Sequence, residues 1–177
     1  MNIAVFCSQN EVAGKYKNAA EEFAQLIAQG KHTLVWGGTD EGLMHIIAEG
    51  THRGGARTIG VIREQIKDRA YKDADEMIVV KDAREMNRGL IERGDVIVAL
   101  IGGVGTLNEL SDVLRMKKNG TGAKPIIVVN TDNFYGGFKL QLERMHNENF
   151  IRDDVMESIY FADTPKDAMR YINEHGN

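Results

Sequence analysis

Short apolar runs alternate with longer amphipathic segments along the whole chain, and this alternation limits the folds that the chain can adopt. The runs rich in valine and isoleucine are Asn2–Phe6, Thr33–Trp36, Thr58–Ile62, Met77–Val80, Val96–Leu100 and Ile126–Val129. Most of them are apolar without a strict polar–apolar alternation, which is typical of strands buried on both faces of a parallel sheet. We therefore predict a strand over each run.

The segments between these runs have the apolar periodicity of helices. Similar patterns predict helices over Tyr16–Gln29, Leu43–Arg53, Arg84–Arg93, Leu107–Lys118 and Phe138–Asn147, and Thr164-Pro165 has the residue types that open a last helix. Strand–helix alternation requires right-handed crossovers with helices on both faces of the sheet. We predict an α/β fold, a doubly wound, mostly parallel, Rossmann-like sheet in three layers (α/β/α). Ligands of such sheets bind at the carboxyl ends of the strands.

The composition indicates one cytoplasmic domain over residues 1–177, because 42% of the residues are apolar, 27% are charged and no linker divides the chain. A net charge of −4 argues against a nucleic-acid or membrane partner. No apolar run reaches the roughly 20 residues that cross a bilayer. Cys7 is the only cysteine, which excludes an intrachain disulfide and fits a reducing compartment.

The strongest functional signal is the segment Ile101–Glu109, IGGVGTLNE, which joins a predicted strand to a predicted helix. Gly102, Gly103 and Gly105 remove side chains, so that backbone N–H groups around Val104 can converge on one anion. The amino terminus of the following helix adds the positive end of its dipole. We therefore predict a phosphate site at this turn.

The same residues also fit a plain strand-to-helix turn. Thr106 would then be the N-cap, and Glu109 would close a capping box, a geometry that is compatible with a bound phosphate. The segment is not a Walker loop, because no Lys-Ser/Thr pair follows Gly105 in the required frame. It is not the dinucleotide fingerprint either, since the first strand-to-helix turn, Cys7–Asn10, has no glycine.

Two further turns are expected at the same edge of the sheet. Gly37, Gly38 and Thr39 follow the second strand, where the backbone can approach a ligand closely and a hydroxyl is available, although a plain turn explains them equally well. Ser8 and Gln9 follow the first strand. Together with the glycine segment, these turns can surround one small phosphorylated ligand.

Other residues give weaker signals. The five histidines are scattered without ligand spacing, so we expect no metal site. Trp36 can stack on a base, but packing in the core is the commoner fate of an aromatic side chain on a strand. Cys7, at the end of a strand, has the position of a small buried apolar residue rather than of a nucleophile.

The order of these motifs resembles the LOG (LONELY GUY) family over nearly the whole chain. The segments that carry the resemblance are FCSQN, LVWGGTDEGLM, RGGARTIGVI, IGGVGTLNEL and KPIIVVNTDNFYGGF. The fourth matches the family's glycine motif PGGxGTxxE except at the leading proline, which is Ile101 here, a minor change in the stiffness of the turn. The resemblance implies a Rossmann-like homodimer that hydrolyses the N-glycosidic bond of a nucleoside 5′-monophosphate, of the AMP or cytokinin riboside type, without a cofactor. Many members carry the label lysine decarboxylase, for which this chain shows no supporting residue pattern.

Carried over position by position, the resemblance assigns the phosphate and ribose to Gly102, Gly103, Gly105 and Thr106. It makes Glu109 the catalytic carboxylate, and a carboxylate can stabilise an oxocarbenium-like ribose or activate the attacking water. The turn at residues 37–39 matches the family's other nucleotide-facing turn.

The chain departs from the family at the arginine that works beside this glutamate. That position is Met86 here, followed by Asn87, and we count both among the residues expected to face the nucleotide. Arg84 and Arg88 are the candidate replacements, but a two-residue offset in a regular helix turns a side chain by about 200°. Arg84 can serve if it lies in the loop before the helix, whereas periodicity places Met86 toward the core.

The loss of this arginine keeps a second hypothesis open, in which the protein is a nucleotide-binding module that senses or carries its ligand without turnover. A purely structural domain ranks last, because it leaves both glycine turns without a purpose.

Overall fold

The six apolar runs and one further segment form a seven-stranded sheet in the computed structural model, which describes residues 1–118 and 124–176. The strands are β1 (Asn2–Phe6), β2 (Thr33–Trp36), β3 (Thr58–Arg63), β4 (Glu76–Val80), β5 (Val96–Ala99), β6 (Ile126–Val129) and β7 (Ile159–Ala162). Their order is β4-β3-β2-β1-β5-β6-β7, and every neighbouring pair is parallel. The predicted doubly wound α/β fold is confirmed.

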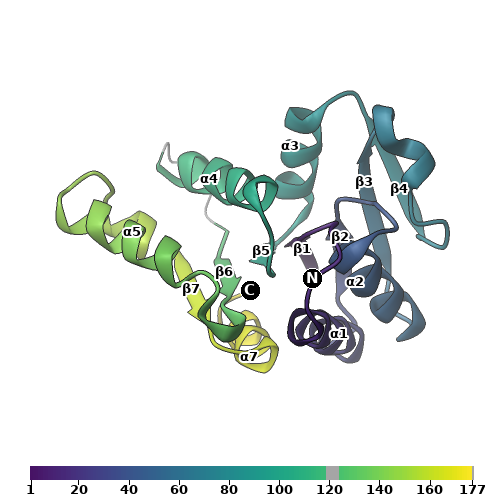
Figure 1. Cartoon of the computed structure of the whole chain (residues 1–177), viewed down its shortest axis with the longest axis horizontal. Coiled ribbons are helices and arrows are strands. Elements are labelled where there is room, and N and C mark those ends of the chain that lie inside the picture. The colour runs from purple at the N-terminus through teal and green to yellow at the C-terminus, as the bar shows by residue number, and fades with distance from the viewer. Residues whose placement is uncertain (119–123, 177) are drawn as a thin grey trace.

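Helices cover both faces of this sheet (Figure 1). On one face lie α1 (Gly14–Gln29), α2 (Gly42–Arg53) and α7 (Pro165–His175), and on the other lie α3 (Ala83–Arg93), α4 (Val104–Lys118) and α5 (Gly136–Asn147). The short elements are η1 (Glu64–Arg69), η2 (Thr131–Asn133) and α6 (Asp153–Met156). Among the described residues, no helix combines the length and the apolar character needed to cross a bilayer.

The core fills the space between the sheet and both helix layers. All residues of β5 and β6 are buried, which explains why these strands are apolar at successive positions. Trp36 is fully buried and packs edge-on against Tyr71 with 6.2 Å between ring centroids, so core packing is confirmed as its role.

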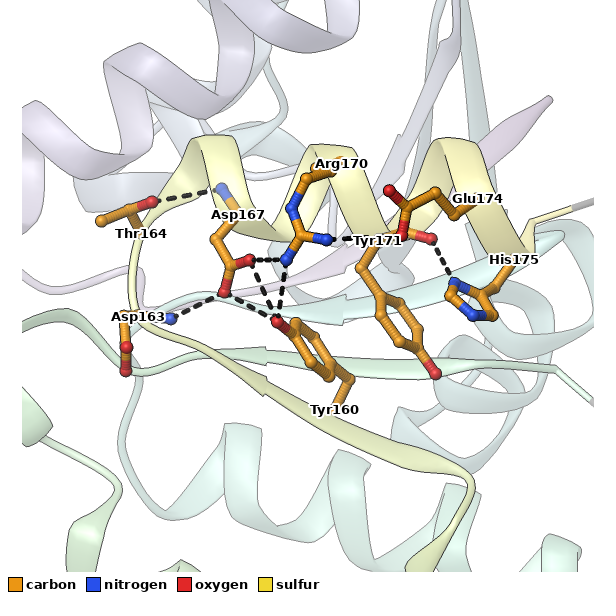
Figure 2. A network of polar contacts seen from close by, with 8 residues as sticks. All are labelled: Tyr160, Asp163, Thr164, Asp167, Arg170, Tyr171, Glu174 and His175. Carbon is orange, nitrogen blue, oxygen red and sulfur yellow. Dashed lines mark hydrogen bonds and ion pairs between the residues drawn. The ribbon is translucent and has the colours of Figure 1, made fainter.

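The edge strand β7 was not predicted, although its four residues are apolar. Figure 2 shows how it is held against α7. The Tyr160 hydroxyl donates to the Asp167 carboxylate at 3.0 Å, and the Tyr160 ring stacks on Tyr171 with 4.0 Å between centroids. Thr164 caps α7 as predicted, since its hydroxyl accepts a hydrogen bond from the Asp167 N–H at 3.1 Å. Polar and ring contacts thus hold β7 and α7 together.

Helix α4 begins at Val104, three residues before its predicted start at Leu107, and this changes the role of Thr106. The first intrahelical hydrogen bond is accepted by the Gly103 carbonyl at 3.1 Å, so Gly103 is the N-cap and Thr106 lies inside the first turn. The predicted capping box is therefore wrong. The Thr106 side chain lies against Gly102, where an added Cβ would be 2.0 Å from its hydroxyl oxygen.

Candidate functional site

The strand order reverses between β1 and β5, and this point locates the site. In open α/β sheets, ligands bind in the crevice outside the carboxyl ends of the two strands at such a reversal. A cleft of about 270 Å³ lies there, and we call it the switch-point cleft. Its lining residues are Cys7, Ser8, Gln9, Asn10, Met44, Arg63, Met86, Gly103, Val104, Gly105, Thr106 and Glu109.

Ser8, which lines the cleft, links the first loop to the glycine turn and to the start of α2. Its N–H donates to the Ile101 carbonyl at 3.1 Å, which ties the first loop to the end of β5. Its carbonyl accepts hydrogen bonds from the N–H groups of Leu43 at 2.9 Å and Met44 at 3.3 Å. At the amino terminus of α2, the N–H groups of Leu43 and Met44 are therefore occupied by the protein's own backbone and are not available to a ligand.

The amino terminus of α4 is different. The first N–H groups of a helix have no partner within it, and in the described part of the chain those of Val104 and Gly105 donate to no other segment. A Cβ added at Gly103 or Gly105 would meet nothing within 4 Å, so the space in front of this turn is open. These amides and the helix dipole are arranged to bind an anion.

Glu109 faces the same cleft from the second turn of α4 and is only 6% exposed. Burial, together with the nearby negative charge of Asp112, raises the pKa of Glu109 to about 8. No ion pair joins its carboxyl to another residue within 1–118 or 124–176. In the ligand-free protein at neutral pH, Glu109 is therefore mostly protonated, and its pKa lies in the range that suits proton transfer.

Comparison with known proteins identifies the family. A family profile described as "Possible lysine decarboxylase" matches residues 44–172. The cytokinin riboside 5′-monophosphate phosphoribohydrolase of Mycobacterium tuberculosis is 32% identical over 170 residues, which cover 95% of this chain and 91% of that protein. The chain belongs to the LOG family. A second LOG protein, the cytokinin riboside 5′-monophosphate phosphoribohydrolase LOG of Oryza sativa subsp. japonica, is 30% identical over 98% of this chain and 73% of its own length.

A solved structure shares the LOG fold of this chain. The molybdenum cofactor binding protein of Rippkaea orientalis superimposes with a TM-score of 0.75 over 98% of this chain and 94% of that chain. The two sequences are 22% identical, so the likeness concerns the fold alone.

Met86 lines the switch-point cleft and also packs against the core. Cys7 is 2% exposed, and burial, reinforced by the charge of Glu109, raises the pKa of its thiol well above the usual range. A thiol that stays protonated is a poor nucleophile, so Cys7 behaves as the expected small buried residue.

The structure places the candidate replacements for the LOG arginine outside the switch-point cleft. Arg84 lies in the first turn of α3, which Asp82 caps, so it does not meet the condition of lying in the loop before the helix. Arg84 and Asn87 line a neighbouring cleft with Asp112, to which the Asn87 amide donates at 3.1 Å. Arg88 pairs with Glu92 at 2.6 Å on the exposed side of α3.

The turn after β2 packs against β3 and β4 instead of lining the switch-point cleft. Gly38 has a φ of +76°, and an added Cβ would lie 3.0 Å from Ile62 and Met77 side-chain atoms. Thr39 is 1% exposed, and its hydroxyl donates to the Met44 sulfur at 2.9 Å. Gly37, Gly38 and Thr39 do not line the switch-point cleft. Met44, in the first turn of α2, does line it.

The one basic residue among the described residues that line the cleft was not predicted from the sequence. Arg63 ends β3, directly after the apolar run TIGVI, and its side chain reaches the switch-point cleft. The available signal was its place at the carboxyl end of a buried parallel strand, where side chains face the ligand crevice. Within the described residues, no group of three or more His, Cys, Asp or Glu side chains is placed to hold a metal ion.

Proposed function

We propose that this LOG-family protein hydrolyses the N-glycosidic bond of a nucleoside 5′-monophosphate, AMP or a cytokinin riboside monophosphate, to a free base and ribose 5-phosphate. The observation that carries the proposal is the meeting of two groups in one cleft. The unpaired amides at the start of α4 suit the phosphate, and the buried Glu109 suits a proton-transfer or charge-stabilising role. Both LOG-family relatives are named for the same class of reaction.

The proposed reaction uses the chain's own groups. The N–H groups of residues 103–106 hold the phosphate and so fix the ribose in the cleft. As the glycosidic bond breaks, the base leaves with the bonding electrons and takes up a proton from the solvent, and positive charge develops on the ribose. Glu109 in its ionised form stabilises that charge and accepts a proton from the water that adds to the anomeric carbon. The proton that Glu109 removes from the attacking water afterwards returns to the solvent, so the protons balance.

Incubation with AMP tests this function directly. We expect adenine and ribose 5-phosphate in equal amounts, detected by chromatography, and little reaction with adenosine, which lacks the phosphate. Cytokinin riboside monophosphates in parallel reactions identify the preferred base. Failure of every monophosphate to release its base contradicts the proposal.

Met86 favours a second candidate function, a nucleotide-binding module without turnover. A thioether in place of the family's guanidinium removes a positive charge from the site. Calorimetry distinguishes the two functions, because the module binds AMP while no adenine is released.

We also propose a homodimer, as the LOG resemblance implies. Among the described residues, the exposed large apolar side chains gather on α4 and on the segment around α5, which lie on the same face of the sheet (Figure 1). They are Val104, Leu107, Phe134, Leu140, Met145 and Phe150, with Val79 as the exception on β4. A second copy covering this face would bury apolar surface that is now exposed to water.

Substitution of Leu140, which is 66% exposed, tests the dimer. Leu140→Asp is expected to weaken association by about 10- to 100-fold, because burying a leucine contributes roughly 1.5–3 kcal/mol. Val79→Asp is the matched control, since Val79 is 48% exposed on another part of the surface. Light scattering over a range of concentrations measures the mass. A wild-type protein that is monomeric throughout contradicts the proposal.

A further inference from the structure

Arg63 brings a positive charge to a cleft that otherwise has none. Its backbone is fixed by pairing with Val80 of β4 at the end of β3, and its side chain lines the same cleft as Met86 and Glu109. It is the only Lys, Arg or His among the described residues that line the switch-point cleft. The helix layer at this point presents Met86, so the cation comes from the sheet instead.

The guanidinium of Arg63 has no partner within residues 1–118 and 124–176. Its Nε atom is buried and makes no hydrogen bond, and no carboxylate of the described chain forms an ion pair with it. More exposed arginines do have such partners: Arg57 pairs with Glu76 at 2.8 Å, and Arg88 pairs with Glu92 at 2.6 Å. A buried donor on a charged group is costly to leave unpaired, so a ligand that satisfies it gains affinity.

Glu109 is not the partner of Arg63. A guanidinium in contact with a carboxylate holds its pKa low. The pKa of Glu109 is instead raised to about 8 by burial and by Asp112, with no compensating cation. The positive charge of Arg63 is therefore available to a group that enters the cleft from outside.

We propose that Arg63 binds the 5′-phosphate of the substrate, opposite the amino terminus of α4. This inference rests on the proposed function and adds the residue that selects for the phosphorylated ligand. A phosphomonoester carries about −1.5 to −2 charges at neutral pH, whereas a helix amino terminus supplies about half a positive charge. The guanidinium supplies a full charge and can bind two phosphate oxygens at once.

Paired measurements with AMP and adenosine test this role. In a Glu109→Gln background, where turnover is removed, calorimetry compares Arg63→Met, Arg63→Lys and the control Arg57→Met. Arg63→Met is expected to weaken AMP binding by about 10- to 100-fold and to change adenosine binding less than about threefold. Arg63→Lys, which keeps the charge but loses the fork of donors, is expected to weaken AMP binding less. Arg57→Met, at the opposite end of β3, leaves both affinities unchanged.

The outcomes separate this inference from the proposed function. Unchanged AMP affinity in Arg63→Met overturns it, and so does an equal loss of AMP and adenosine binding, which would place the guanidinium on the ribose or base. If the wild-type protein binds AMP through Arg63 but releases no adenine, the proposed hydrolysis fails while the phosphate contact stands. A wild-type protein that binds no AMP overturns both.

Discussion

Glu109→Gln is expected to lower the rate of adenine release from AMP by about a thousandfold, the middle of the range for positioned acid–base groups. The amide resembles the protonated carboxyl of the ligand-free protein in shape, so AMP affinity is expected to stay within a few fold. Steady-state release and calorimetry measure the two effects. Glu92→Gln, on the exposed side of α3, is the matched control and keeps full activity. If Glu109→Gln retains more than about a tenth of the activity, the catalytic role is excluded.

The pH profile identifies the active form of Glu109. Its pKa of about 8 means that only the minor fraction is ionised at pH 7. If the carboxylate acts on the water, kcat/KM rises about tenfold per pH unit below 8 and levels off above it. A profile that falls across this range instead assigns the protonated form as an acid.

The same pKa predicts that Glu109 lowers stability in alkaline solution. The ordinary pKa of 4.5 is raised to about 8 by folding, so the native state holds a proton that the unfolded chain releases. The stabilisation from this proton is complete below the unfolded value and is lost as the pH rises through the folded value. At pH 9, the free energy of unfolding of Glu109→Gln is therefore expected to be at least about 1 kcal/mol higher than that of the wild type. Urea titrations at pH 5 and pH 9 measure the difference.

Much of the fold was predictable because buried parallel strands have a distinctive composition. The runs ending at Phe6 and Trp36 were located within a residue, since both faces of these strands are covered by helices. The edge strand β7 was missed although all four of its residues are apolar. Its attachment to α7 depends on the hydrogen bond and the stacked ring of Tyr160, contacts that the spacing of residues does not show.

Only the parts of the site that are formed by backbone groups could be predicted from the sequence. The glycine turn before α4 could be placed because a strand–glycine–helix pattern fixes its own geometry. Side chains that depend on neighbouring strands could not be placed: Arg63 reaches the cleft from β3, more than forty residues before Glu109 in the sequence. Likewise, Asp82 caps α3 and so fixes which residues of the helix face the cleft. Met86 lines the cleft, and Arg84 lies outside it.

The approach of Gly42 to the first loop leads to the largest expected loss of stability. Gly42 has a φ of +54°, and an added Cβ would lie 2.4 Å from the carbonyl carbon of Gln9 and 2.5 Å from the carbonyl oxygen of Asn10. These are backbone atoms, which cannot rotate away as a flexible side chain can. Gly42→Ala is expected to cost about 4 kcal/mol or more in free energy of unfolding, the range reserved for severe packing and backbone conflicts.

Gly55→Ala provides the matched control, because Gly55 also has a positive φ, +80°, but a Cβ there meets nothing within 4 Å. It is expected to cost only about 1–2 kcal/mol, the strain of a left-handed backbone in a residue with a side chain. The difference between the two variants in urea unfolding therefore measures the contact between the loops. Since Gln9 and Asn10 line the switch-point cleft, Gly42→Ala also loses adenine release whereas Gly55→Ala retains it. Equal stability of the two variants would mean that the first loop does not rest against α2, and the wall of the cleft would then lie elsewhere.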